Sequence, residues 1–342
     1  MSDLLRYFHP VLPARKLGKG PVKVSFDGKG FAFFRDHEGH AGALLDRCPH
    51  RFAPLSAGRV RPDGRLACPY HGWHFDGRGH GKSPSLPQLT NCDVQAFSVV
   101  EQDGFLWLGR EGATMPTHET TGYELAGVFA MRFDAPLFVA LDNFCEDEHT
   151  PYVHTYLGWL ERDVSTVEFE AENGPDFTRV RYRARQRPAP IARLVGMRSG
   201  DWFHNDWVTR FDPVCTTYEI FWSSPETGER RPLSLRVPVY FVPLDERTTQ
   251  LSTVVYARSD LGPLPRPVMA LLKKLALGLV WNEFKDDRAF VKHVKDTPFE
   301  TKGMRLGKFD KPLIHNHKLL ERIYWQRPQD STPPKADAPD AS

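Results

Sequence analysis

The sequence predicts an α+β fold, in which a small all-β domain is followed by a larger domain with an antiparallel sheet flanked by helices. Three observations support this prediction. The chain has 342 residues, the length of about two domains. Its first third is rich in Gly, Pro and short alternating apolar runs, and the rest combines β-branched and aromatic segments with one long helical pattern. We therefore expect domains at 1–112 and 113–328, and a disordered tail at 329–342.

Short apolar runs in the first domain indicate strands of a small antiparallel sheet. These runs are Gly30–Phe34, Ala41–Leu45 and Gly104–Gly109. The segment Glu111–Tyr123 follows them and is polar, with a proline and several threonines. This composition is typical of a connector between two domains.

The second domain has strand-like segments ahead of a long helix. Their aromatic and β-branched content predicts an antiparallel sheet. A helix is expected from about Pro267 to Lys295. The predicted strands are Phe177–Tyr182, Thr216–Trp222, Leu233–Phe241 and Gln250–Tyr256.

Composition excludes several classes of protein. The 45 basic and 43 acidic residues nearly balance, so charge does not favour a nucleic-acid partner. Five cysteines are an odd number, which disfavours a secreted disulfide scaffold, and Cys92, Cys145 and Cys215 are expected to be buried thiols. The N-terminus has no apolar signal core, and no stretch approaches the roughly 20 apolar residues of a membrane span. We expect a cytoplasmic protein without a membrane partner.

Two short motifs each pair a cysteine with a histidine. Cys48 and His50 lie in Cys-Pro-His-Arg, and Cys68 and His71 lie in Cys-Pro-Tyr-His-Gly-Trp. Two thiolates on one iron and two imidazoles on the other are the ligands of one type of [2Fe–2S] cluster. A structural zinc ion is the alternative, because the same residues suit tetrahedral zinc. The two loops are nearly identical and each is opened by a proline, whereas zinc fingers use a turn and a helix, so the pattern favours the cluster.

A second group of metal-capable side chains lies at 142–154. Glu146 and His149 are three residues apart and would share one face of a helix. His149 and His154 are five apart, which at about 100° per residue is off any common face. Pro151 lies between the two histidines, so we expect a broken helix that brings both imidazoles to one point. Two unrelated histidines are the alternative.

The long helix provides a carboxylate in an apolar setting. Val280, Phe284, Asp287, Val291 and Val294 recur at helical spacing and predict one buried stripe. A carboxylate at the position of Asp287 is costly unless it is paired or binds a metal. Two imidazoles and one carboxylate form the facial triad that binds non-haem Fe(II). A buried arginine that pairs with Asp287 is the alternative.

These motifs resemble those of the Rieske non-haem iron oxygenases, specifically the large (alpha) oxygenase component of the monooxygenase and demethylase branch. The resemblance covers most of the chain. The two cysteine loops are similar to the family's cluster motif. The pattern Asn143-x-x-Glu146-x-x-His149-x-x-x-x-His154 is similar to its mononuclear-iron motif, and Asp287 falls where the third ligand is expected.

The resemblance implies a role for each motif residue. Asn143 and Glu146 would be catalytic. The family usually has aspartate at position 146, where it joins a cluster histidine of one subunit to an iron-binding histidine of the next. Glu146 would take this role unless the adjacent Asp147 does. The implied ligands are Cys48, His50, Cys68 and His71 for a Rieske [2Fe–2S] cluster, and His149, His154 and Asp287 for mononuclear Fe(II).

The resemblance also implies partners and a reaction. It implies a head-to-tail homotrimer that uses O2 to hydroxylate or oxidatively demethylate a small, ring-bearing organic substrate. The chain has no Gly-x-Gly-x-x-Gly unit after a strand and no ferredoxin-type cysteine run, so a separate flavin-dependent NAD(P)H reductase is expected to supply electrons, directly or through a ferredoxin. The alternatives are an electron-transfer protein without oxygenase activity and an aromatic-ring dihydroxylating dioxygenase.

The position of the substrate is left open by the sequence. Aromatic residues at 202–207, 221–222 and 239–241 are either the lining of a pocket for a ring-bearing molecule or the core of the predicted sheet.

Overall fold

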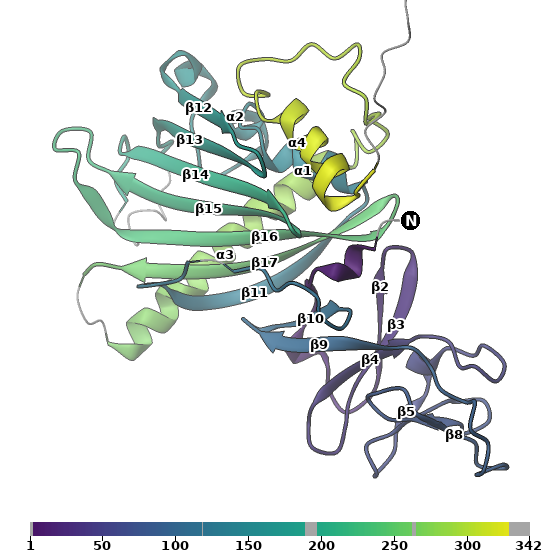
Figure 1. Ribbon diagram of the computed structural model, residues 1–342. Coiled ribbons are helices and arrows are strands. Elements are labelled where there is room, and N and C mark those ends of the chain that lie inside the picture. The colour runs from purple at the N-terminus through teal and green to yellow at the C-terminus, as the bar shows by residue number, and fades with distance from the viewer. Residues whose placement is uncertain (1–2, 118, 189–196, 262–264, 328–342) are drawn as a thin grey trace, which may run out of the picture.

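The computed structural model describes residues 3–117, 119–188, 197–261 and 265–327 (Figure 1). The predicted tail at 329–342 lies outside these residues. The described chain forms three antiparallel sheets, two small ones near the N-terminus and a large one in the second part, and this agrees with the predicted fold class.

The first sheet has six strands in the order β1-β10-β9-β4-β3-β2. β10 is buried at every position, because it lies inside the sheet and Tyr240 of the second part of the chain packs on its Trp107. The strands are β1 (His9–Pro13), β2 (Val22–Phe26), β3 (Lys29–Arg35), β4 (Ala41–Leu45), β9 (Ala96–Gln102) and β10 (Phe105–Gly109).

The second sheet consists of four two-residue strands that hold the cysteine loops. A hydrophobic cluster that includes Phe34, Leu55 and Phe75 packs this sheet against the first one. The strands are β5 (Arg59–Val60), β6 (Leu66–Ala67), β7 (His74–Phe75) and β8 (Gly81–Lys82).

The large sheet has seven strands in the order β11-β17-β16-β15-β14-β13-β12. In β13 buried and more exposed residues alternate, as expected for a strand with one covered face, whereas β16 is buried along most of its length. The strands are β11 (Glu124–Phe133), β12 (Glu168–Asn173), β13 (Phe177–Arg185), β14 (Trp202–Phe211), β15 (Val214–Ser223), β16 (Arg230–Asp245) and β17 (Thr248–Ser259).

Helices cover one face of this large sheet. The longest of them crosses the sheet beside β11 and β17 (Figure 1). It begins at prolines, whose fixed φ suits the first helical turn. The helices are α1 (Leu137–Phe144), α2 (Thr150–Val153), α3 (Arg266–Val291) and α4 (Leu313–Leu319), and a π-helical turn, Leu320–Tyr324, follows α4. Single 3-10 turns lie at Leu4–Arg6, Ala14–Lys16, Leu55–Ala57 and Glu161–Thr166.

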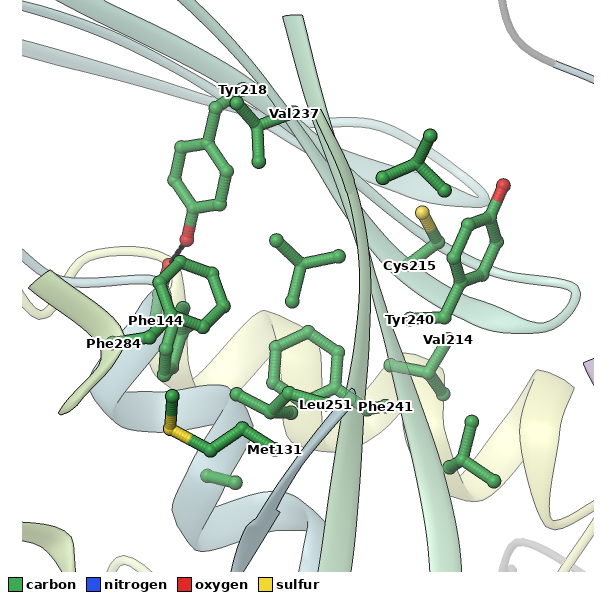
Figure 2. Packing of buried hydrophobic residues seen from close by; sticks show 14 of the residues in the cluster. Met131, Phe144, Val214, Cys215, Tyr218, Val237, Tyr240, Phe241, Leu251 and Phe284 are labelled. Carbon is green, nitrogen blue, oxygen red and sulfur yellow. Dashed lines mark hydrogen bonds between the residues drawn. The ribbon is translucent and has the colours of Figure 1, made fainter. Parts of the chain in front are cut away.

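Two successive residues of β16 pack on opposite faces of the large sheet, one against the helices and the other against the first sheet. Figure 2 shows Phe241 on the same side as Phe144 and Phe284, and Tyr240 on the other side. The ring of Phe241 lies 5.9 Å from that of Phe144 in α1, and the ring of Tyr240 lies 4.9 Å from that of Trp107 in β10. The large sheet is therefore packed between the helices and the first six-stranded sheet, and one apolar core runs through both parts of the chain.

Most of the predicted elements are present. Six of the seven predicted strands lie within observed strands, and Ala41–Leu45 matches β4 residue for residue. The seventh, Gly104–Gly109, begins one residue before β10. The long helix ends at Val291, short of the predicted Lys295, so Val294 falls outside it and is 36% exposed. The strands β11, β12 and β14 were not predicted. The domain boundaries at 112 and 328 stay predictions.

Two further expectations concern membrane-spanning segments and the cysteine thiols. No helix in the described part of the chain combines the length and the apolarity that a membrane crossing requires. All five cysteines are free and buried, as expected for Cys92, Cys145 and Cys215.

Candidate metal centres

The two cysteine loops have the same backbone pattern. The N–H of Cys48 donates to the carbonyl of Ala53, and the N–H of Cys68 donates to the carbonyl of Trp73, five residues on in each case. Each cysteine carbonyl accepts from the residue four positions on, which has a positive φ in both loops: Phe52 at 60° and Gly72 at 72°. The near-identity seen in the sequence is therefore a duplicated loop structure.

These loops bury the thiols and expose the imidazoles. Cys48 and Cys68 are 1% and 3% exposed, whereas His50 and His71 are exposed. The two imidazole rings lie 4.6 Å apart, and Trp73 stacks on His50 with the rings 5° from parallel. Burial raises the pKa of the Cys48 thiol to about 11, and a bound metal would have to displace that proton. The structure thus brings together all four predicted cluster ligands at one end of the molecule.

The second predicted group of ligands converges in the larger part. The Nε2 atoms of His149 and His154 are 2.9 Å apart, and each lies close to Oδ1 of Asp287, at 3.3 and 3.2 Å. No arginine contacts the Asp287 carboxylate in the described part of the chain, and its third partner is the side-chain amide of Asn143 at 3.1 Å. The alternatives of two unrelated histidines and of an Arg–Asp pair are therefore not what the described residues form.

A broken helix explains this convergence as predicted, although the break precedes Pro151, which lies in the first turn of a new helix. α1 ends at Phe144, and the one-turn helix α2 begins at Thr150 with Pro151 in its first turn. His149 precedes α2 and His154 follows it in an extended conformation, so the two imidazoles point to one place. The expectation that Glu146 and His149 share a helical face is wrong, because both lie in the turn between α1 and α2, although their side chains do meet.

Each imidazole also contacts a carboxylate through its other nitrogen. Nδ1 of His149 hydrogen-bonds to Glu146, and Nδ1 of His154 hydrogen-bonds to Glu283. With Nδ1–H donating to a carboxylate, each Nε2 keeps its lone pair for a metal. The sequence motifs did not single out Glu283, which is only 5% exposed.

The charges around the two imidazoles suit a divalent cation. Burial would raise the pKa of Asp287, but His154 and His149 hold it well below its usual range. Burial would lower the pKa of His154, yet Asp287 and Glu283 raise it to about 9. Three carboxylates thus surround two imidazoles, and a 2+ ion at the Nε2 and Oδ1 atoms would replace the protons that this surplus negative charge attracts. Two imidazoles and one carboxylate are also the donor set of non-haem iron sites.

Asp147, the alternative to Glu146, makes no hydrogen bond or ion pair with His149 in the described part of the chain. It is 5% exposed, one of its oxygens lies 3.4 Å from the hydroxyl of Thr150, and the other has no hydrogen-bond partner. Burial raises its pKa to about 7. Of the two acidic residues, Glu146 is the one that contacts His149.

A cavity of about 90 Å³ adjoins the three convergent residues. Its polar groups besides the site residues include Asn205, whose buried Oδ1 has no hydrogen-bond partner, and no lysine or arginine is among the described residues that line it. A cavity of about 150 Å³ holds benzene, so this one admits a methyl or methoxy group with part of a ring. Its apolar walls include Phe144, Leu157, Phe203, Trp207, Tyr218, Ile220, Val237, Val280 and Phe284.

The aromatic segments singled out in the sequence divide between cavity and core. In 202–207, Phe203, Asn205 and Trp207 line the cavity. Residues 221–222 and 239–241 are not among its lining residues, and Trp222, Val239, Tyr240 and Phe241 belong to the apolar core.

Known proteins show similarity to both parts of the chain. Residues 8–101 match the family described as the Rieske [2Fe-2S] domain. 4beta-methylsterol monooxygenase of Methylococcus capsulatus is 29% identical over 262 residues, covering 72% of this chain and 65% of the relative. The oxygenase component of dicamba O-demethylase from Stenotrophomonas maltophilia is 35% identical over 151 residues, covering 41% and 44%. The chain thus spans less than two thirds of the length of either relative.

Several solved structures match along almost the whole chain. One of them is the crystal structure of dicamba monooxygenase bound to dicamba, with a TM-score of 0.75 and 21% identity, covering 96% of this chain and 100% of that one. At this identity the match describes the fold alone.

Proposed function

We infer that this chain, which carries a Rieske [2Fe–2S] domain on the fold of a Rieske oxygenase alpha component, is the oxygenase component of a multi-protein monooxygenase or demethylase. The observation that carries the proposal is the convergence of His149, His154 and Asp287 beside an apolar cavity, in the same chain as the four cluster ligands. An electron carrier needs only the cluster and leaves this second site without a role.

The proposed site has a ligand set and a set of residues that orient it. His149, His154 and Asp287 would hold mononuclear Fe(II), which when bound supplies the activation of O2. Asn143 donates to Oδ1 of Asp287 at 3.1 Å and fixes the carboxylate rotamer. The apolar walls of the cavity exclude water and leave room for the substrate beside the ligands.

Electron supply is proposed to involve a second copy of the chain and a separate reductase. Glu146 contacts His149, and we propose that its other face meets His71 of a neighbouring copy in a head-to-tail trimer. The exposure of His50 and His71 is what such a contact requires. A flavin-dependent NAD(P)H reductase, directly or through a ferredoxin, is the proposed source of electrons.

The proposed substrate is a small, uncharged, ring-bearing organic molecule. The absence of lysine and arginine among the described lining residues disfavours a carboxylate substrate, and the aromatic walls favour a ring. The similarity to a methylsterol monooxygenase and a dicamba demethylase supports hydroxylation or oxidative demethylation.

Metal analysis and a turnover assay test the proposal. The oxygenase requires two cluster irons and one further iron, about three per chain, whereas an electron carrier has about two and a zinc protein none. With a surrogate reductase, methoxy and N-methyl arenes should release formaldehyde on demethylation, and a product heavier by one oxygen indicates hydroxylation. A dihydroxylating dioxygenase would give a product heavier by two oxygens. A chain with only two irons and no oxygen uptake contradicts the proposal.

A further inference from the structure

We propose that Glu283 is a positioning residue that fixes His154 for metal binding. One face of α3 would then supply the ligand Asp287 and also the residue that orients the ligand His154. This inference rests on the proposed metal site and extends it. Glu283 and Asp287 are four residues apart on α3, and both side chains are buried. Residues at this spacing lie above one another on one helical face.

Glu283 is surrounded by donors that all come from one segment. One carboxylate oxygen accepts from Nδ1 of His154, and the other lies 3.2 Å from the N–H of Tyr156 and 3.4 Å from the N–H of Leu157. A buried carboxylate is stable only when its hydrogen-bonding capacity is met, and these three donors meet it. The carboxylate therefore determines both the orientation of the imidazole and the path of the chain that follows it.

A buried arginine holds the same segment from its other side. The guanidinium of Arg187 donates to the carbonyl of Thr150 at 3.1 Å and also to the carbonyls of His154 and Trp159. The Arg187 guanidinium therefore donates to backbone carbonyls of this segment, and the Glu283 carboxylate accepts from its backbone N–H groups. Between these two groups, His154 has one ring orientation, with Nε2 directed at Asp287.

The two histidines differ in where their support comes from. Glu146 lies three residues from His149, in the same turn, and forms a local contact. His154 depends on a residue 129 positions away in the sequence. Loss of the Glu283 charge should therefore weaken the site through His154 while the backbone of the turn around His149 stays in place.

A substitution series separates positioning from a merely structural role. Glu283→Gln keeps an oxygen for the two backbone N–H groups but replaces the carboxylate oxygen that accepts from the imidazole and removes its negative charge. Glu283→Asp keeps the charge on a side chain one methylene shorter. Asp286→Asn is the matched control, since Asp286 is the next acidic residue on α3 and its carboxylate accepts from the Thr155 hydroxyl at 3.3 Å.

The experiment measures Fe(II) affinity in the full-length protein with its cluster intact. Mononuclear iron is removed with a chelator, and Fe(II) is returned against a competing chromogenic chelator. Loss of a carboxylate behind a metal-binding histidine typically weakens metal affinity about 10–100-fold, and we expect this for Glu283→Gln. Glu283→Asp should fall between it and the wild type, and Asp286→Asn should match the wild type. The electron paramagnetic resonance spectrum of the reduced cluster should be unchanged in all three.

Each outcome has one interpretation. Wild-type affinity in Glu283→Gln, with the cluster signal intact, overturns the inference and leaves the metal site standing. If Glu283→Gln loses the cluster signal because it does not fold, Glu283→Asp decides, and equal affinity in that variant overturns the inference. A wild-type chain that binds no Fe(II) beyond the cluster irons overturns the proposed site together with the inference.

Discussion

At the scale of single residues, each of the two convergent histidines hydrogen-bonds to a carboxylate through Nδ1, which leaves Nε2 for a metal. The carboxylate is Glu146 for His149 and Glu283 for His154. The sequence motifs identified His149, His154 and Asp287 because aspartate interrupted an apolar stripe and histidines flanked a proline. Glu283 gave no comparable signal, because its partners belong to a segment 126–129 residues away. Contacts of this kind depend on tertiary packing and are not readable from local spacing.

Replacing Asp287 tests the proposed iron site directly. Asp287→Ala removes the only carboxylate that faces both Nε2 atoms among the described residues. We expect loss of the mononuclear iron and of turnover, with the absorbance spectrum of the cluster unchanged. Asp286→Ala, one position away on α3, should retain iron and activity. Full activity in Asp287→Ala refutes the triad.

His9 gives a prediction about pH. Its Nδ1 donates to the carbonyl of Tyr7 at 2.9 Å, its Nε2 accepts from the Tyr324 hydroxyl at 3.1 Å, and burial lowers its pKa from 6.5 to about 3. Below pH 6.5 the unfolded chain therefore binds a proton that the folded chain does not bind. The free energy of unfolding should fall by about 1.4 kcal/mol per pH unit from pH 6.5 towards 3, and show no contribution from His9 above pH 6.5.

Urea titrations of the wild type and of His9→Phe at a series of pH values measure this contribution. The variant has no group to protonate at this position, so its stability should decline less steeply below pH 6.5. Parallel curves for the two proteins would show that folding does not lower the pKa of His9 and would contradict the prediction.

At the scale of elements, the cysteine loops are two copies of one structure. The same hydrogen bonds close both loops, and the left-handed position is Phe52 in the first and Gly72 in the second. Glycine adopts this conformation without cost, whereas other residues do so at about 1–2 kcal/mol. The first loop therefore carries a backbone cost that the second avoids.

Gly72→Ala should add that cost to the second loop. The new Cβ would lie 3.5 Å from Pro84 Cγ, an ordinary contact, so the effect comes from the backbone alone. We expect less cluster per chain and a lower temperature of cluster bleaching. Gly77→Ala is the control, because that glycine has open space and no positive φ. Equal bleaching temperatures in both variants would contradict the prediction.

The sequence predicted the elements of this fold unevenly, for physical reasons. Strands with dense β-branched and aromatic residues, such as β15, β16 and β17, were predictable from composition. β12 was not, because half of its residues are glutamates and it lies at the edge of the sheet. The long helix was predicted from its stripe, but its C-terminal end was placed four residues too late because Val294 fits the stripe without being helical.

At the scale of the whole molecule, both parts share one apolar core. Besides the contact of Trp107 with Tyr240, the hydroxyl of Ser252 donates to the carbonyl of Pro10, and the amide of Gln250 donates to the carbonyl of Val11 at 2.9 Å. The N–H groups of Asp27 and Gly28 donate to carbonyls of β16. Such a junction predicts one cooperative unfolding transition.

Trp107→Ala tests this prediction. Trp107 is fully buried, and truncation of such a side chain typically costs about 3–5 kcal/mol. We expect loss of the cluster absorbance and of far-ultraviolet circular dichroism at one common, lowered temperature. Trp281→Ala, which removes a side chain that is 44% exposed, should have a much smaller effect. Two separate transitions would show that the parts unfold independently.

The shared core also has a consequence for how catalysis depends on concentration. Figure 1 shows the β5–β8 loops at the opposite end of the molecule from α2, and a continuous core between them leaves no hinge by which one chain could fold its own cluster onto its own triad. Under the proposed function, the distance between cluster and triad within one protomer is therefore fixed, and electrons must reach the triad from the cluster of a neighbouring copy. If the proposed trimer forms, dilution below its dissociation constant should abolish turnover without loss of bound metal, and a return to higher protein concentration should restore it.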